Sequence, residues 1–222
     1  KLEKDAKRGD KEAAAKFAFA QKLEPHLDAG KPAITFELEE DEQPIAKSLF
    51  LLTAKPTIFA ANVQDGDLAS ADSNPHVETV RTYGREHHGC ETVVISAQIE
   101  SELADLDEDE AKEFLADLGV EESGVGLLIR AAYHLLGLRT YFTCGPKETR
   151  AWTIHIGDTA PQAAGVIHTD FERGFIKAET IAYDDFVQYQ GEQGAREAGR
   201  LRLEGKEYVL SDGDIMHFRF NV

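Results

Sequence analysis

TYFTCGPKETRAWTIHIGDTAPQAAGVIHTDFERGFIKAETIAYDDF, residues 140–186, decides the fold of the C-terminal part of the chain. Short β-prone runs alternate here with glycines, and one helix-like segment, near Pro161 to Asp170, interrupts them. The predicted strands are Arg139–Thr143, Thr149–Ile156, Ile176–Ala182, Glu207–Leu210 and Asp214–Phe220. Several strands and one helix in so short a span predict a compact α+β domain.

Upstream of this region, apolar strands alternate with helices. Thr57–Ala61 and Thr92–Ile95 are short β-prone runs that each lead into a polar loop, and a helix is predicted between them from about Asn74 to His88. Further helices are predicted at Glu42–Leu52, Glu108–Leu118 and Val125–Leu136. This order indicates part of a parallel α/β sheet, whose ligands bind at the carboxyl ends of the strands.

The N-terminal region predicts two helices joined by a turn. Lys1–Lys7 and Lys11–Ala29 contain strong helix formers, Asp10 is a suitable N-cap, and Gly30 can end the second helix. We interpret them as the tip and one arm of an antiparallel hairpin, whose other arm would precede Lys1. The start at Lys1 without Met also suggests that this is not a natural N-terminus. A solvated, charged helix with no partner is the alternative.

Charge and composition limit the possible functions. The net charge of −17 argues against non-specific nucleic-acid binding by the whole chain, and we expect no DNA partner. The charge is uneven: residues 1–22 carry +3, residues 23–138 carry −17 and residues 139–222 carry −3. No apolar run is long enough for a membrane span, and two cysteines are too few for a disulfide framework. These features predict a soluble, cytoplasmic protein, and we also expect it to be monomeric.

Two strand-end segments suggest a nucleotide-base site. Asn62-Val63-Gln64-Asp65 follows the first buried strand, and Ser96-Ala97-Gln98 follows the second. In P-loop GTPases an Asn-Lys-x-Asp motif reads the base, because its Asn and Asp side chains form hydrogen bonds to guanine and the neighbouring loop. A later Ser-Ala loop presents a backbone N–H to the base. The candidate base-contacting residues are Asn62, Val63, Asp65, Ser96, Ala97 and Gln98.

These segments carry a family resemblance. Thr53-Ala54-Lys55-Pro56, leading to Ala61-Asn62-Val63, resembles the fourth nucleotide motif of the YchF/Obg-like ATPases. Residues 140–186 and EAGRLRLEGKEYVLSDGDIMHFRFNV, residues 197–222, are similar to the TGS domain of that family almost residue for residue. The resemblance covers essentially the whole chain. It implies a partial helical hairpin over 1–40, the closing part of a P-loop nucleotide-binding domain over 41–138, and a ubiquitin-like β-grasp TGS domain over 139–222.

The resemblance implies ATP or GTP with Mg²⁺ in the intact parent protein. No Gly-x-x-x-x-Gly-Lys-Ser/Thr loop occurs in this sequence, and such a loop holds the phosphates during hydrolysis. We therefore assign no catalytic residue to this chain, and we expect it to be inactive alone and to bind no nucleotide tightly. Asp65 stands where the family usually has Glu, and Val63 replaces the Lys of GTPases. ATP remains slightly ahead of GTP.

The resemblance also implies a ribosome-associated function. The candidate contacts with rRNA or ribosomal proteins are basic or polar residues of the hairpin and the TGS region: Lys4, Lys7, Arg8, Lys11, Arg150, His168 and Arg173. The hairpin tip is where a phosphate backbone would be tolerated on an acidic chain. The alternative function is a non-enzymatic adaptor that binds RNA or protein through the TGS domain.

Other polar clusters favour structural interpretations. His87, His88 and Cys90 are adjacent at a helix end and point in different directions, so no metal site is predicted. Asp105 to Glu113 fits a capped helix start. Trp152 could stack on a nucleic-acid base, but a core Trp is the simpler interpretation. Asp212-Gly213-Asp214 is typical of a hairpin turn.

Overall fold

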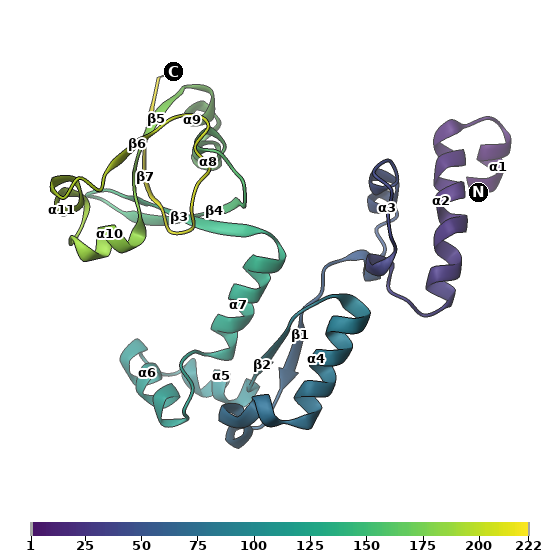
Figure 1. Cartoon of the computed structure of the whole chain (residues 1–222), viewed down its shortest axis with the longest axis horizontal. Helices are drawn as coiled ribbons and strands as arrows, with labels where there is room; N and C mark the ends of the chain where they lie inside the picture. The colour runs from purple at the N-terminus through teal and green to yellow at the C-terminus, as the bar shows by residue number, and fades with distance from the viewer. Residues whose placement is uncertain (1, 222) are drawn as a thin grey trace. The chain divides into compact units, whose positions relative to one another are not determined.

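The computed structural model describes residues 2–221 and shows a mixed α/β chain (Figure 1). The chain divides into two compact units, of which unit 1 ends at Ala132 and unit 2 begins at Tyr133. In the described residues, no helix is both long enough and apolar enough to span a membrane. The predicted domain limits at residues 40 and 138 remain predictions.

Unit 1 begins with the predicted helical pair. Helix α1 spans Leu2–Lys7 and packs on α2, which spans Lys11–Asp28 (Figure 1). The Asp10 carboxylate accepts hydrogen bonds from the first free N–H groups of α2, as predicted for an N-cap. Phe19 of α2 is buried and meets the ring of Phe36 edge to face. This contact ties α2 to the segment that follows it, which contains the short 3-10 helix η1 (Ala33–Thr35).

The predicted parallel strand pair is present. Strand β1 (Phe59–Asn62) pairs in parallel with β2 (Thr92–Ile95), and helix α4 (Pro75–His88) connects them. Asn74 caps α4 through its side chain, and Gly89 ends it with a left-handed backbone. A parallel pair requires such a crossover, so the alternating pattern in the sequence was correctly interpreted.

The remaining elements of unit 1 are short helices. The helix predicted over Glu42–Leu52 is shorter, because α3 covers Gln43–Ser48 and the 3-10 helix η2 covers Leu52–Ala54. The helices α6 (Glu108–Asp117) and α7 (Gly124–Leu135) are as predicted within one or two residues. Asp107 and Glu110 form a capping box on α6, which confirms the structural interpretation of that acidic stretch. The 3-10 helix η3 (Asp65–Ser73) and α5 (Ala97–Leu103) were not predicted.

Unit 2 is built on one five-stranded mixed sheet. Its strands, in chain order, are β3 (Leu138–Cys144), β4 (Thr149–His155), β5 (Phe175–Ile181), β6 (Arg202–Glu204) and β7 (Ile215–Phe220). Their spatial order is β4-β3-β7-β5-β6, in which β3 and β7 are parallel and the other neighbours are antiparallel. The last strand therefore lies at the centre of the sheet.

Each face of this sheet has its own apolar cluster. Helices α8 (Ala160–Ile167) and α9 (Thr169–Arg173) belong to the larger cluster, which contains buried Tyr141, Met216 and Phe218. The helices α10 (Tyr183–Gln188) and α11 (Glu192–Glu197) belong to the second cluster, with Ile181 and Ile215. Ile215 and Met216 are adjacent in β7 and lie in different clusters, because successive side chains of a strand point to opposite faces.

Several predictions for unit 2 were wrong in detail. The single helix predicted from Pro161 to Asp170 is two helices, because His168 has extended backbone angles and starts α9 as its N-cap. The strand predicted at Glu207–Leu210 is absent from the described residues: Val209 makes one isolated bridge to Thr159. The strand that pairs with β5 at this edge of the sheet is β6. Its three residues contain one apolar side chain, Leu203, so they gave no apolar pattern.

The predicted hairpin turn at Asp212-Gly213-Asp214 is also wrong. The segment turns, but it docks on β3 instead of joining two antiparallel neighbours. The Thr140 N–H donates to Asp212 Oδ1 over 2.8 Å, and the Gly213 N–H donates to the Thr140 carbonyl over 2.8 Å. The turn thus aligns β7 with β3 in a parallel arrangement, which a hairpin could not provide.

Candidate functional site

The two predicted base loops are joined in the structure. Parallel pairing of β1 and β2 places Asn62 opposite Ile95, at the carboxyl ends of both strands. The Ala97 N–H donates to Asn62 Oδ1 over 2.9 Å, and the Val63 N–H donates to the Ile95 carbonyl over 2.9 Å. One side chain from the first loop therefore fixes the backbone of the second, as expected for a site at a strand-end crevice.

Ser96 plays a different part from its neighbours. Ser96 is 1% exposed, and its Oγ is buried without a hydrogen-bond partner among the described residues. Ala97 and Gln98 are exposed in the first turn of α5, and Gln98 Nε2 donates to Glu102 Oε1 over 3.3 Å. Of the three predicted residues in this loop, only Ala97 and Gln98 present surface to a ligand.

The other predicted base contacts lie just beyond β1. Val63 is half-buried, and Asp65 is exposed at the first residue of η3. Gln64 has extended backbone angles, and the 3-10 helix η3 starts at the next residue, Asp65. The structure thus places Asn62, Asp65 and the Ala97 turn on the same end of the two-stranded sheet.

A glycine contact supports this loop and was not predicted. Glu100 of α5 accepts a hydrogen bond from the Gly124 N–H over 2.6 Å. A Cβ at Gly124 would lie 2.8 Å from Ile95 Cγ2, so only glycine permits this close approach. The only signal for this contact in the sequence was a glycine, Gly124, at the start of a helix. Predicting that it packs against Ile95 would have required the position of β2.

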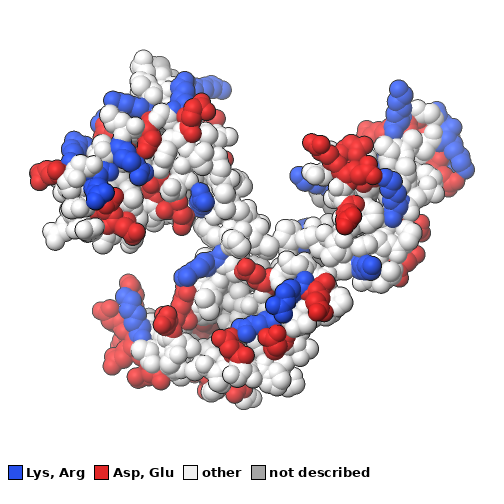
Figure 2. All heavy atoms as spheres, in the orientation of Figure 1, with Lys and Arg blue, Asp and Glu red and all other residues white. Residues whose placement is uncertain are grey.

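The basic residues predicted as ribosome contacts on the hairpin are exposed, and two are partly neutralised. Lys7 Nζ lies 2.7 Å from Glu3 Oε1, and Arg8 Nη1 lies 3.9 Å from Asp5 Oδ1. Lys4 and Lys11 are also exposed. Figure 2 shows Lys and Arg side chains projecting from this end of the chain beside acidic ones. Such exposed pairs contribute little to stability, so these cations can exchange partners.

The predicted contacts in unit 2 lie on separate elements. His168 accepts the Asp170 N–H through Nδ1, so it acts as a helix cap, and Arg173 is exposed in the last turn of α9. Arg150 lies over the Trp152 ring, 4.2 Å from its centroid. Trp152 is half-buried against the larger cluster and donates through Nε1 to Thr143 Oγ1. The indole is thus part of the core at one edge and accessible at another.

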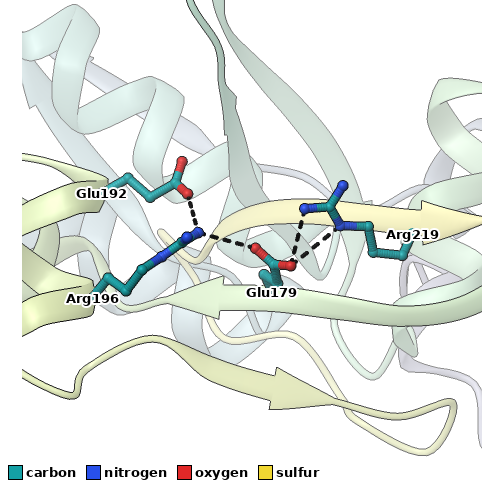
Figure 3. Close-up of polar contacts among 4 residues, drawn as sticks. All are labelled: Glu179, Glu192, Arg196 and Arg219. Atoms are coloured by element: carbon teal, nitrogen blue, oxygen red, sulfur yellow. Dashed lines mark hydrogen bonds and ion pairs between the residues drawn. The ribbon is translucent and has the colours of Figure 1, made fainter.

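Sequence reasoning missed a four-residue charged network in unit 2 (Figure 3). Glu179 of β5 accepts from Arg219 Nε and Nη2 at 3.2 and 3.1 Å, and from Arg196 Nη2 at 3.4 Å. Arg196 also donates to Glu192 over 2.7 Å. The Glu179 side chain is 14% exposed, whereas the two arginines are more than half exposed. Glu179 is 40 positions from Arg219 and 17 positions from Arg196, so local patterns gave no signal for this network.

The structure gives no support for a metal centre at the His–Cys segment. His88 lies against the Phe59 ring, and His87 lies against the Tyr83 ring. Cys90 Sγ contacts the Gly84 carbonyl, and burial raises the pKa of this thiol. Within residues 2–221, no group of three or more His, Cys, Asp or Glu side chains is arranged to hold a metal ion.

Comparison with known proteins first defines the class of unit 2. Residues 138–221 match the family described as "YchF-GTPase_C: Protein of unknown function (DUF933)". This match covers β3 to β7, so the five-stranded mixed sheet is the TGS-like C-terminal domain of that group.

Comparisons over the whole chain then identify its relatives. The whole chain is 53% identical to "Ribosome-binding ATPase YchF" of Pasteurella multocida (strain Pm70) and 49% identical to that of Bacillus subtilis (strain 168). It spans 60% of the length of both relatives. "Structure of the Schizosaccharomyces pombe YchF GTPase" superposes with a TM-score of 0.77 and 36% identity, over 94% of this chain and 55% of that one. The chain is therefore homologous to YchF proteins over 60% of their length.

Proposed function

We propose that this chain contributes the base-contacting loops and two contact surfaces of a ribosome-binding, nucleotide-dependent ATPase. The hydrogen bond between Asn62 and the Ala97 N–H carries the proposal, because it joins the two loops that would surround a purine. The relatives named "Ribosome-binding ATPase YchF" match all 222 residues, including both loops. The names of these relatives state ribosome binding and ATP hydrolysis. We propose both activities for the intact protein that contains this chain.

The two units take defined places in this proposal. We assign β1, β2 and their helices to the closing part of a P-loop nucleotide-binding domain, in which ligands bind at the carboxyl ends of parallel strands. We assign unit 2 to a ubiquitin-like β-grasp TGS domain, because its last strand lies centrally between β3 and β5. We also propose a cytoplasmic, monomeric protein.

Asp65 and Val63 both bear on the choice of base in the intact protein. Exposed at the start of η3, its carboxylate could accept two hydrogen bonds from guanine, whereas Val63 offers no lysine stem beside the base. We therefore expect ATP to be slightly preferred to GTP. Calorimetric titration of the intact protein with both nucleotides tests this. A GTP affinity at least tenfold higher, worth about 1.4 kcal/mol, would contradict it.

The chain alone should bind nucleotides weakly. A phosphate-binding Gly-x-x-x-x-Gly-Lys-Ser/Thr loop does not occur in its sequence, and Asn62 and Ala97 can contact only a base. Titration of the 222-residue chain with ATP and GTP in the presence of Mg²⁺ should give dissociation constants in the millimolar range or higher. A millimolar constant corresponds to a binding free energy on the order of −4 kcal/mol. Micromolar binding would mean that other residues hold the phosphates.

Ribosome contact is proposed at the hairpin tip. Reversing the charges of Lys7, Arg8 and Lys11 should weaken co-sedimentation with ribosomes and flatten its salt dependence, because fewer phosphates would be neutralised. Arg150, His168 and Arg173 form a second proposed contact set in unit 2, to be replaced in the same assay.

A matched control for the hairpin variant reverses three other exposed lysines: Lys47, Lys55 and Lys112. Both triple variants change the net charge equally. If the two variants lose ribosome binding equally, bulk charge explains the effect, and the hairpin tip is excluded as a specific contact.

A non-enzymatic adaptor is the second candidate function. The observation that favours it is that unit 2 has a complete sheet with a buried cluster on each face, whereas unit 1 offers only base loops. An adaptor would keep its ribosome affinity whether or not nucleotide is added. A change of about threefold or more in affinity on adding ATP to the intact protein would favour the first candidate.

A further inference from the structure

Helix α5 carries the second base loop and is held by few contacts. Its first residue, Ala97, donates its N–H to Asn62 Oδ1, and its third residue, Ile99, is 1% exposed. A helix of seven residues is not stable by itself in water, so contacts with its surroundings must fix its orientation. Ser96 precedes α5 but makes no side-chain cap hydrogen bond. The Ala97–Gln98 turn therefore depends on Asn62 and on contacts further along the helix.

Glu100 makes such a contact with the start of another helix. Glu100 is half-buried, and its Oε1 accepts a hydrogen bond from the Gly124 N–H over 2.6 Å. Gly124 is the first residue of α7, where N–H groups lack a partner inside the helix and the helix dipole is positive. A carboxylate is a favoured acceptor at this position, because the bond is charge-assisted. This bond joins α5 to α7.

The start of α7 is in turn fixed against β2. A Cβ at Gly124 would lie 2.8 Å from Ile95 Cγ2 and 3.0 Å from Ile95 Cα, so the two backbones approach closely here. Ile95 is the last residue of β2, and its carbonyl accepts the Val63 N–H. Ser123 also holds the first turn of α7, since its Oγ accepts the Gly126 N–H over 3.0 Å. Glu100 therefore ties α5 to a fixed point.

These contacts form a closed ring around the two base loops. Hydrogen bonds and one packing contact link its members, which are, in order, Asn62, Ala97, Glu100, Gly124, Ile95 and Val63. The Asn62 bond and the Glu100 bond both act on the first turn of α5, each from a different neighbour. Loss of either bond would let the turn move about the other. Glu100 is the only ionisable member of this ring.

We propose that Glu100 is a positioning residue for the nucleotide base: it holds the Ala97–Gln98 turn in the orientation that faces the purine. Glu100 does not contact the nucleotide in this proposal, because its Oε1 is engaged by the Gly124 N–H. It acts through the orientation of α5. The inference rests on the proposed function, since it requires that the two loops surround a base.

A cap that only stabilises α7 would behave differently. Its loss would weaken the binding of every part of the nucleotide alike, because the whole domain would be less stable. A positioning residue affects the base and leaves the phosphates unchanged. Inorganic tripolyphosphate, which has no base, separates the two roles.

Hydrogen exchange in the 222-residue chain tests the geometry without a nucleotide. Glu100→Ala should accelerate exchange at the Ala97 amide by at least about threefold, because the turn loses one of its two hydrogen bonds. Glu100→Gln keeps a neutral acceptor for the Gly124 N–H and should fall between wild type and Glu100→Ala. Should Glu100→Ala fail to fold, Glu100→Gln carries the same comparison.

Glu122→Ala is the matched control. It removes one carboxylate two residues before the start of α7, where Glu122 forms an ion pair with Arg130 of the same helix. The charge change is the same as in Glu100→Ala, but the bond from α5 to Gly124 remains. Exchange at Ala97 should change by less than about twofold.

Titrations of the intact protein then test the base. Glu100→Ala should raise the dissociation constant for ATP by at least about threefold, the net worth of one hydrogen bond. Its affinity for tripolyphosphate should stay within about twofold of wild type, since the phosphates are held by a different loop. Glu100→Gln should recover part of the ATP affinity, and Glu122→Ala should match wild type for both ligands.

Three results would overturn the inference: unchanged exchange at Ala97 in Glu100→Ala, equal losses of ATP and tripolyphosphate binding, or an equal loss of ATP binding in Glu122→Ala. Failure of the proposed function would appear in the wild type instead. A wild-type intact protein that binds no ATP, or binds it no more tightly than tripolyphosphate, would remove the proposed function and this inference with it. Normal ATP binding by both wild type and Glu100→Ala would remove the inference alone.

Discussion

The two units differ in how they bury apolar side chains. In unit 2, both faces of one sheet carry contiguous buried clusters, which include Tyr141 and Ile215. In unit 1, buried side chains such as Ile99 lie on separate short elements, the sheet has two strands, and Phe50 is 86% exposed. Two-stranded sheets are marginally stable alone. We infer that the two buried clusters of unit 2 stabilise it independently of unit 1, whereas the base loops of unit 1 depend on a few local contacts.

The largest expected effect comes from opening the core of unit 2. Tyr141 is fully buried, and its hydroxyl donates to the Ala163 carbonyl over 2.8 Å. Tyr141→Ala should reduce the free energy of unfolding of unit 2 by about 3–5 kcal/mol, as other buried aromatic truncations do. Urea unfolding followed by Trp152 emission measures this, since that single tryptophan lies in unit 2.

Ile99→Ala is the matched test in unit 1, because Ile99 is 1% exposed. It should leave the Trp152 transition within about 0.5 kcal/mol of wild type if the units unfold separately. An equal loss from both variants would show that the chain unfolds as one cooperative body, and the contrast between the units would then be wrong.

A smaller effect is expected at the buried carboxylate of unit 2. The Asp214 side chain is 2% exposed and accepts from Tyr208 Oη at 2.7 Å and from the Ser211 N–H at 2.9 Å. Asp214→Asn should cost about 2 kcal/mol, because charge-assisted hydrogen bonds inside the protein are lost. The same urea experiment measures it. Asp184→Asn, at an exposed site, is the control and should change stability by less than about 0.5 kcal/mol.

Alkaline pH should weaken unit 2 through its buried phenols. Burial raises the pKa of Tyr141, and burial followed by the Asp214 hydrogen bond raises that of Tyr208. The neutral phenol is thus favoured in the folded state: its contribution is complete below the unfolded pKa, about 10, and declines as pH rises above it. For Tyr141 the decline is about 1.4 kcal/mol per pH unit.

Urea unfolding near pH 9 and pH 11 tests this slope, with Tyr141→Phe as the comparison. The Phe variant keeps the ring and should lose less stability between the two pH values than wild type does. If the slopes are the same, ionisation of Tyr141 does not contribute, and lysine or Tyr208 titration explains the decline.

The smallest expected effect lies in the base loops. Asn62→Ala removes the acceptor of the Ala97 N–H and should cost about 0.5–1.5 kcal/mol locally. Hydrogen exchange at the Ala97 amide should then accelerate by about threefold to tenfold. Gln98→Ala, which leaves this bond intact, is the control. Unchanged exchange in Asn62→Ala would mean that the loop is held by the strand pairing alone.

The sequence predicted the fold best where one local signal was sufficient. Strands β1 and β2 are apolar runs, and the helix between them has Asn74 before it and Gly89 after it. The strand predicted at Glu207–Leu210 was wrong because Val209 and Leu210 satisfy an apolar pattern without a neighbouring strand. Strand pairing depends on distant residues, and no pattern within the segment reports them.

The candidate site was predictable to a similar extent. Spacing correctly predicted a parallel strand pair whose carboxyl ends lead into the Asn62 and Ser96 segments, whereas the base contacts assigned to these segments remain predictions. It did not predict that Ser96 would be buried, since that depends on the packing of α5. The pairing of Glu179 with Arg219 joins residues on two strands whose register was unknown from sequence.

The central position of β7 has a consequence for how unit 2 is assembled during synthesis. Its sheet consists of two antiparallel pairs, β3–β4 and β5–β6, that are connected only through β7. As the chain emerges from N- to C-terminus, both pairs are available before the strand that unites them. The sheet closes only when Ile215–Phe220 has left the exit tunnel, so a premature stop before Ile215 would yield two unconnected strand pairs instead of a smaller domain.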